Sequence, residues 1–390
     1  MLCTVQPNRD TWYEIHLDVL HSNYRAVRQI AGSTVYLCPV LKADAYGMGS
    51  IMAARTFLQA DRDGPARSGS LRYCAVACLS EAVELREALP DLPLLIMGYT
   101  PDRLLPEVVA HRIVPTIFER RQAEILAASA QDTTSVPLHI KIDTGMNRLG
   151  LEDTPEGLET VTAISRLPGI RIEGLFSHLA LAGRTSDMEQ FHRLQQFVRR
   201  ATVAGVSLGY IHICDSIGML RYPEFRLDMV RPGAILYGAP PLHDKIGADI
   251  GIPFAFKTRI ARLRRLGAGE GVSYDYTWRA PSNGAVIATL PVGYADGYQR
   301  SFSNTAFTCV RGVRAPVVGL ICMDQTMIDV SSVPGVEQGD EVLLLGRSGN
   351  SEVPLLEAAD WAGSNRNAVL TAIGKRVPRV YIPLHTYKEP

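Results

Sequence analysis

The chain has 390 residues, which exceeds the usual size of one domain and favours either two domains or a barrel with an appended domain. Lysine plus arginine and aspartate plus glutamate both number 40, so no net charge attracts nucleic acid or an anionic membrane, and we expect a small-molecule partner. The seven cysteines contain no CxxC pair, which argues against a disulfide framework and a structural zinc site. We therefore predict a reducing compartment and no metal.

The N-terminal region gives no targeting signal. The first ten residues are polar, and no later stretch has the roughly 18 consecutive apolar residues that a membrane span needs. These features predict a cytoplasmic protein without membrane contact.

Short apolar runs alternate with helical patterns over the first 240 residues, which is typical of parallel βαβ units. Amphipathic segments such as Glu81–Leu89 and Glu119–Ala130 separate the runs. Eight parallel strands with connecting helices predict a TIM-like (β/α)8 barrel, with an open doubly wound sheet as the alternative. We expect these strands at Val35–Leu41, Tyr73–Ala77, Leu92–Met97, Ile113–Ile117, Leu138–Asp143, Ile172–Ser177, Tyr210–Cys214 and Leu227–Val230.

Polar residues follow several of these strands, at the end of a barrel where active sites lie. Taken alone, Lys42 would be a solvated surface lysine, because most lysines in proteins are exposed. A catalytic lysine instead needs a partly desolvated site with other charges nearby. The residues at the strand ends are Lys42, Asp143, His178, Asp215, Ser216 and Arg231.

The pattern changes after Pro240, where Pro240–Pro241 begins a predicted linker. We predict a barrel domain over residues 10–240 and a β-rich C-terminal domain over residues 241–390. Residues 61–72 are rich in glycine, serine and charge and predict an exposed loop. The strands expected in the second domain are Val286–Leu290, Thr308–Val310, Val317–Leu320, Met327–Val330 and Val342–Leu345.

Ten motifs between residues 12 and 381 resemble, in the same order, those of alanine racemases. They are WYEIHLDVLHSNY, LKADAYG, KIDTGMNRLG, EGLFSH, HICDS, VRPGAILYG, GVSYD, PVGYADG, GLICMDQ and RVPRVY. The resemblance implies an enzyme of pyridoxal-phosphate (PLP) fold type III that interconverts L- and D-alanine, with serine or other amino acids as further candidate substrates.

By this resemblance, Lys42 forms the Schiff-base link to PLP, and Tyr274 is the acid or base on the opposite face of the cofactor. Racemisation requires such a pair, because the α-proton leaves one face and a proton returns to the other. A free tyrosine, with a pKa of about 10, is a poor base at neutral pH, so positive charge or hydrogen bonds must stabilise its phenolate. In the family, the residue matching Arg148 approaches the tyrosine and the substrate carboxylate, and the residue matching His178 links the tyrosine to the arginine beneath the cofactor ring.

The resemblance also assigns the cofactor contacts. Arg231 matches the arginine that faces the pyridine nitrogen, and His212 matches the residue that orients this arginine. An arginine cannot accept a proton, so the ring remains a weaker electron sink, which favours racemisation over transamination. The phosphate cradle corresponds to Tyr46, Ser216, Gly233 and Ala234.

Lys141 shares one face of its expected strand with His139 and Asp143. A buried free lysine would be costly and would repel Arg148, whereas a carbamylated lysine, as many family members carry, could hold that arginine. A pair between Lys141 and Asp143 is the alternative.

Two motifs of the second domain resemble segments that reach the active site of the other subunit. By that resemblance, Met323 contacts the substrate carboxylate through its backbone, Tyr294 narrows the access channel, and Asp324 supports them. Together with Tyr274, these residues imply a head-to-tail homodimer with two composite sites.

The sequence departs from the family at several positions. Met48 replaces a histidine, Asp215 replaces an asparagine beside the phosphate serine, and Asp275 follows the catalytic tyrosine. The run Ala180–Ser186 lacks the usual aspartate. Asn367 stands at a cofactor-binding position, where a tyrosine usually contacts the phosphate and crowds the substrate side chain. Extra carboxylates would raise the pKa of the tyrosine, and Asn367 would widen the pocket toward serine.

Two other classes are weighed against a racemase. One is a PLP-dependent lyase on the same fold, either a decarboxylase or an aldolase, and the other is a PLP carrier without turnover. The lyase relatives show a glycine-triplet phosphate motif that this sequence lacks, and Tyr274 in a second domain disfavours the carrier.

Overall fold

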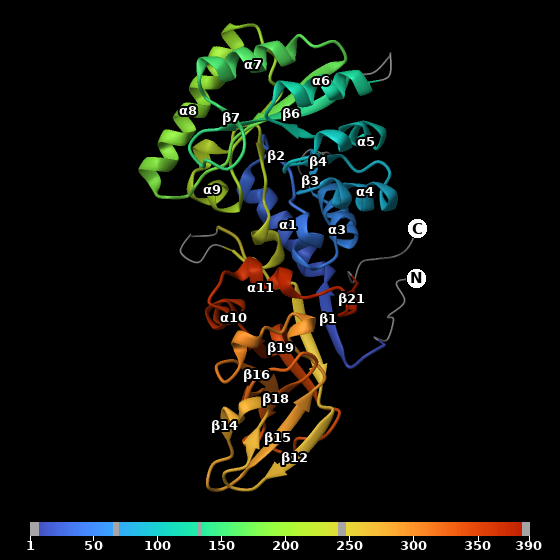
Figure 1. Cartoon of the computed structure of the whole chain (residues 1–390), viewed down its shortest axis with the longest axis vertical. Coiled ribbons are helices and arrows are strands. Elements are labelled where there is room, and N and C mark those ends of the chain that lie inside the picture. Colours follow the sequence, from blue (N-terminus) through green and yellow to red (C-terminus); the bar gives the residue numbers. More distant parts are fainter. Residues whose placement is uncertain (1–7, 65–69, 131–134, 241–246, 384–390) are drawn as a thin grey trace.

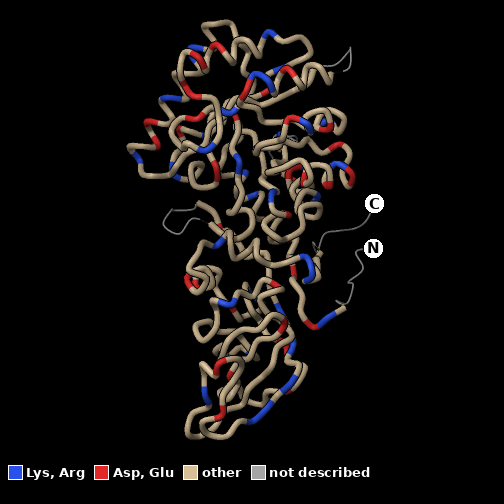
Figure 2. Tube along the Cα trace, viewed as in Figure 1, with Lys and Arg blue, Asp and Glu red and all other residues tan. Residues whose placement is uncertain are grey.

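The computed structural model describes residues 8–64, 70–130, 135–240 and 247–383. Figure 1 shows a helix-rich part built from the first half of the chain and a strand-rich part built mainly from the second half. Along the chain trace, Lys and Arg positions are interspersed with Asp and Glu positions in both parts (Figure 2). No helix in the described ranges combines the length and the apolar character needed to cross a membrane.

Eight parallel strands form the predicted barrel, and each overlaps the range expected from the sequence. Direct ladders join β3 to β4, β5 to β6, β6 to β8 and β8 to β9. Isolated bridges such as Val40 to Ala75 and Leu95 to Val114 link the shorter strands. The strands are β2 (Tyr36–Leu37), β3 (Cys74–Val76), β4 (Leu94–Ile96), β5 (Thr116–Ile117), β6 (Val136–Asp143), β8 (Ile170–Phe176), β9 (Tyr210–His212) and β10 (Met229–Val230).

The barrel closes on itself, which excludes the open doubly wound sheet. Strand β10 pairs in parallel with the first strand, β2. On its other side, the amides of Asp228 and Arg231 donate to the carbonyls of Ile211 and Cys214, so β10 also bonds to the β9 segment. Both faces of a barrel strand are buried, as β6 illustrates with Leu138, Ile140 and Ile142 on one face and His139 and Lys141 on the other.

Helices connect these strands around the outside of the barrel (Figure 1). Their apolar stripes face the core, as in α1, where Leu20, Tyr24 and Val27 are fully buried. The segments expected at Glu81–Leu89 and Glu119–Ala130 are helices α4 and α6. The helices are α1 (Leu17–Ala31), α3 (Ser50–Arg62), α4 (Leu79–Ala88), α5 (Leu105–Ala110), α6 (Arg120–Ser129), α7 (Pro155–Ser165), α8 (Arg184–Val203) and α9 (Ser216–Arg221), with short strand β7 at Leu151–Glu152.

The C-terminal half is β-rich, as predicted, and its largest sheet has the order β17-β16-β19-β11-β1-β21, with β20 paired to β19. A second sheet has the order β12-β15-β18, and β13 pairs with β14. The strands are β11 (Phe254–Arg259), β12 (Arg262–Leu266), β13 (Gly271–Val272), β14 (Trp278–Arg279), β15 (Ala285–Leu290), β16 (Phe307–Val310), β17 (Val313–Pro316), β18 (Thr326–Asp329), β19 (Glu341–Ser348), β20 (Ser351–Val353) and β21 (Arg379–Ile382).

Some local expectations differ from the structure. The strand expected at Val317–Leu320 is wrong: Val317 makes only an isolated bridge to Ile328, and Gly319 has a φ of 74°, which ends extended structure. Helices α10 (Leu355–Ala362) and α11 (Arg366–Ala372) were not expected.

The start of the chain belongs to the C-terminal sheet. Strand β1 (Thr11–His16) pairs antiparallel with β11 and parallel with β21, so it connects the two halves. The linker predicted from Pro240–Pro241 extends into residues 241–246, and the loop predicted at 61–72 includes residues 65–69; both segments lie outside the described residues. The domain division at residue 240 therefore stays a prediction.

Candidate active site

A cavity of about 460 Å³ lies at the carboxyl ends of the barrel strands, within the size range of small-molecule sites. Most of the residues singled out in the barrel line it, and α11 contributes a residue from the C-terminal half. These lining residues are Lys42, Tyr46, Lys141, Arg148, His178, Asp215, Ser216, Arg231, Gly233, Ala234 and Asn367. Five of the segments that supply these residues end or follow barrel strands, as the rule for barrel active sites predicts, and the sixth is α11.

Lys42 begins a left-handed turn, α2 (Lys42–Tyr46). The four residues Ala43 to Tyr46 all have φ between 53° and 55°. This conformation costs L-residues about 1–2 kcal/mol each, so surrounding contacts must hold it. Burial and the charge of Arg148 lower the pKa of Lys42 below its ordinary value, which leaves more of its amine neutral.

Arg231 is buried beneath the cavity, with 3% of its surface exposed. Its guanidinium donates to the carbonyls of Ser177 at 3.0 Å and Ile213 at 2.8 Å, and to the Nδ1 atoms of His212 at 2.6 Å and His178 at 3.2 Å. It therefore remains a cation whose position is fixed from four sides.

The arginine also fixes the protonation of the histidine below it. Because the guanidinium can only donate, His212 Nδ1 accepts, and His212 must carry its proton on Nε2. That nitrogen lies 3.1 Å from Nδ1 of His139, which accepts in turn. Burial lowers the pKa of His212 and lowers the pKa of His139 to about 3, so both rings stay neutral at physiological pH.

The proposed phosphate cradle is tightly packed. Ser216 Oγ accepts from the amide of Gly233 at 2.9 Å, and Tyr46 stacks on Tyr237 with ring centroids 4.8 Å apart. A Cβ atom on Gly233 would lie 2.5 Å from the Tyr46 hydroxyl, so the close approach requires glycine here. Burial, followed by the charge of Asp215, raises the pKa of Tyr46 to about 12, which keeps this phenol protonated.

Asp215 has a local structural role that the sequence comparison did not reveal. Its carboxylate accepts from the amides of Ile217 at 3.0 Å and Gly218 at 2.8 Å and thereby caps helix α9. Asparagine and aspartate are about equally good at this position, so the departure from the family preserves the cap and adds a negative charge.

Lys141 is 6% exposed, and its Nζ donates to the Ile142 carbonyl at 2.9 Å. Asp143, the alternative partner, instead accepts the amides of Gly145, Met146 and Arg148 at 2.8–3.0 Å. No salt bridge joins these two described side chains, Lys141 and Asp143. Burial lowers the pKa of Lys141 to about 7, so the amine is partly neutral at physiological pH.

Apart from Asn367, the site residues expected from the second domain do not line this cavity. Tyr274 is 66% exposed and precedes β14, which Figure 1 places in the strand-rich part. Met323 and Tyr294 are also exposed, and the amide of Tyr294 donates to the Cys322 carbonyl at 3.1 Å. Ser273 Oγ donates to the Leu320 carbonyl at 2.6 Å, which ties the tyrosine turn to the same region. One chain therefore places the predicted site residues in two groups.

A buried carboxylate that the sequence reasoning missed organises the second group. Asp296 is fully buried and accepts from Arg9 at 2.7 Å, from Arg376 at 2.9 Å and from the Gly293 amide at 3.0 Å. Arg376 also pairs with Asp324 at 2.7 Å. The GYADG motif contained this aspartate, but its partners come from both chain ends, so no local signal could identify them.

Phe176 was also missed. The Arg231 guanidinium lies 5.2 Å and the Lys141 Nζ 5.7 Å from its ring centroid, and its ring stacks on His212 at 4.7 Å. Its position at the end of β8, two residues before His178, was the available signal.

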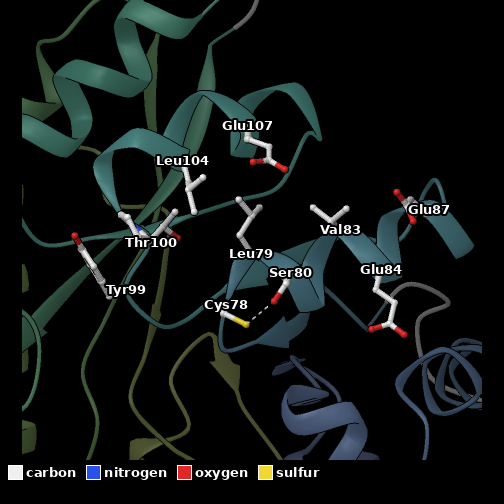
Figure 3. Close-up of a pocket in the computed structure, with 11 residues that line it drawn as sticks. Cys78, Leu79, Ser80, Val83, Glu84, Glu87, Tyr99, Thr100, Leu104 and Glu107 are labelled. Carbon is white, nitrogen blue, oxygen red and sulfur yellow. Dashed lines mark hydrogen bonds between the residues drawn. The ribbon is translucent and has the colours of Figure 1, made fainter. Parts of the chain in front are cut away.

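A second cavity of about 530 Å³ lies between α4 and α5, and no predicted site residue lines it. Figure 3 shows Leu79, Val83 and Leu104 in its apolar lining and Glu84 on the surface of α4. We assign the candidate active site to the cavity that Lys42 lines, because this cavity contains the buried guanidinium of Arg231 and the amine of Lys42, whose pKa is lowered.

Comparison with known proteins identifies the family. The sequence model described as "Alanine racemase, N-terminal domain" matches residues 15–241, and the one described as "Alanine racemase, C-terminal domain" matches residues 254–381. The alanine racemase of Desulfovibrio desulfuricans is 38% identical over 380 residues, covering 96% of this chain and 99% of that protein.

Solved structures agree along the whole chain. The alanine racemase of Bacillus anthracis with bound L-Ala-P gives a TM-score of 0.86 at 28% identity, covering 96% of this chain and 95% of that one. The alanine racemase of Bartonella henselae with covalently bound pyridoxal phosphate gives 0.82 at 26% identity, covering 96% and 99%. These matches confirm the family resemblance carried by the ten motifs and the expected barrel with its β-rich second domain. They also favour a racemase over the lyase alternative. The chain belongs to the alanine racemase family.

Proposed function

We propose that this chain is a PLP-dependent racemase that interconverts L- and D-alanine, with Lys42 and the Tyr274 of a second copy as its two proton-transfer groups. The observation that carries the proposal is the cavity in which Lys42, with its lowered pKa, faces a buried Arg231 fixed by four hydrogen bonds. Family membership and the PLP-bound relative support the cofactor and the reaction.

The residues of the cavity fit PLP. Lys42 supplies an amine for covalent attachment, and the closely packed Ser216, Gly233 and Tyr46 form a cradle of polar groups for a phosphate. Arg231 offers a permanent cation for the ring nitrogen. When bound, PLP withdraws electrons from the α-carbon of an amino acid and so acidifies its α-proton.

The protein then has to move protons on two faces. Lys42 takes or returns the α-proton of the D-enantiomer on one face, and its lowered pKa leaves more of the amine neutral and able to accept that proton. Arg231 keeps its protons at physiological pH, and two acceptors, His212 Nδ1 and the Ser177 carbonyl, hold its guanidinium in place, so it would not transfer a proton to the ring nitrogen. Arg148, which lines the same cavity, binds the substrate carboxylate.

Tyr274 serves the other face from a partner subunit. Within one chain Tyr274 is exposed and does not line the Lys42 cavity. Exposed apolar patches commonly mark interfaces with other proteins. A head-to-tail homodimer would insert Tyr274, Tyr294 and Met323 of one copy into the cavity of the other and would exclude water from the reaction.

Asn367 extends the proposal to substrate range. It lines the cavity from α11, and by the sequence resemblance it stands where the family usually has a tyrosine. A smaller amide leaves space and offers a donor and an acceptor, so we propose that serine is turned over alongside alanine.

Two experiments test the proposal. Reduction with borohydride should fix PLP on wild-type protein and not on Lys42→Ala, and retention of a reducible adduct in the variant would refute the assignment of Lys42. Lys42→Ala and Tyr274→Phe subunits, co-expressed with different tags, should form mixed dimers that contain one intact site. With free assortment, about one quarter of wild-type activity should return. No recovery in purified mixed dimers would contradict the shared site.

A further inference from the structure

The strained turn after Lys42 is held by contacts from distant parts of the chain. Four consecutive residues with side chains adopt the left-handed conformation, which is rare outside glycine. At its far end, Arg379 Nε donates to the Gly47 carbonyl at 3.0 Å, and the Asp44 carboxylate accepts from the Ser50 amide at 2.7 Å. The turn needs comparable support at its beginning, where Lys42 projects.

Glu81 provides that support. It is the third residue of α4, and its Oε1 accepts from the Ala43 amide at 2.7 Å. Its Oε2 accepts from the Ala77 amide at 2.8 Å, directly after strand β3. One carboxylate therefore joins the residue that follows Lys42 to the end of the neighbouring barrel strand. Both bonds are charge-assisted, which makes them stronger than neutral hydrogen bonds.

We infer that Glu81 is a positioning residue that fixes the Lys42 backbone in its strained turn and aims the amine at the cofactor. This inference rests on the proposed role of Lys42. Glu81 lines a neighbouring space and not the Lys42 cavity, so it acts through the Ala43 amide and not by contact with the cofactor or substrate. Without this acceptor, the turn loses the bond at its first amide and relaxes toward conformations that L-residues prefer.

Glutamine is the informative replacement. Its amide oxygen can accept only one of the two N–H groups, and its NH₂ group would face the other, so at least one bond is lost without a change of size. Glu84→Gln is the matched control, because Glu84 lies one helical turn further along α4, is exposed and lines the separate cavity of Figure 3.

The experiment measures PLP affinity of full-length protein, by titrating PLP-free samples and following the visible absorbance. Glu81→Gln should weaken PLP binding by about 10- to 100-fold, the range for loss of a charge-assisted hydrogen bond, while Glu84→Gln stays at the wild-type value. In heavy water, α-proton exchange from D-alanine, the enantiomer served by Lys42, should slow more than exchange from L-alanine. Thermal unfolding of the PLP-free samples is recorded alongside.

The outcomes separate this inference from the proposed function. If Glu81→Gln lowers the unfolding midpoint but leaves PLP affinity at the level of Glu84→Gln, or slows exchange from both enantiomers equally, Glu81 is only structural and the inference is wrong. Lys42→Ala is measured in parallel. If that variant keeps a reducible PLP adduct, the role of Lys42 fails instead, whatever Glu81→Gln shows.

Discussion

The burial of Lys141 determines how the stability of the fold should change with pH. The unfolded chain keeps this lysine protonated up to its ordinary pKa of 10.5, whereas the folded protein releases the proton at about 7. Between these values the unfolded state binds more protons, so the stability of the fold rises with pH. The difference corresponds to a cost of about 5 kcal/mol, which is fully present below pH 7 and vanishes as the pH approaches 10.5.

Lys141→Met removes this cost while keeping a side chain of similar length. In PLP-free protein and CO₂-free buffer, the variant should unfold at a higher temperature than wild type near pH 6, and its advantage should shrink as the pH rises toward about 9. Lys257→Met is the matched control. Lys257 is also buried but pairs with Glu14 and Glu341, each at 2.9 Å, so its loss should destabilise the fold.

Bicarbonate adds a chemical arm to the experiment. The neutral Lys141 amine can add to CO₂ and release one proton to solvent, which gives a carbamate whose negative charge would be attracted to Arg148 and Arg231. Bicarbonate at about pH 8 should therefore raise the unfolding midpoint of wild type and leave Lys141→Met unchanged. A stability difference between wild type and variant that does not change with pH would refute the reasoning.

Two further changes probe the cavity. Asn367→Tyr should lower the ratio of kcat/KM for serine to kcat/KM for alanine by a factor that corresponds to roughly 1–3 kcal/mol of discrimination. An unchanged ratio would show that this residue does not set specificity. Asp215→Asn keeps the cap of α9 and removes a negative charge beside Ser216, so the unfolding midpoint should stay within a degree or two while PLP binds about 2- to 10-fold tighter. Weaker binding of PLP would contradict the electrostatic argument.

The sequence predicted those parts of the fold that depend on local pattern. Apolar runs located all eight barrel strands, and the strand-end rule gathered Lys42, His178 and Arg231 into one cavity. The prediction of strands from apolar runs failed where one residue overrides the pattern. Gly319 does so by ending the strand expected at Val317–Leu320.

Contacts between distant segments could not be predicted. The pairing of β1 with β11 and β21, the ion pairs of Asp296 and the bonds from Glu81 to the Lys42 turn all join residues that are far apart in the chain. Periodicity reports which face of an element is buried but does not report which partner it meets. The roles of the site residues likewise stay predictions, because they depend on a cofactor and a second copy.

The central claim is that Lys42 and Tyr274 act on opposite faces, and proton exchange tests it most directly. Tyr274→Phe should slow α-proton exchange in heavy water from L-alanine by about 10²–10⁴-fold, while exchange from D-alanine, which Lys42 serves, is much less affected. Phenylalanine keeps the ring and removes only the hydroxyl. Equal loss for both enantiomers, or no loss for either, would contradict the two-face mechanism.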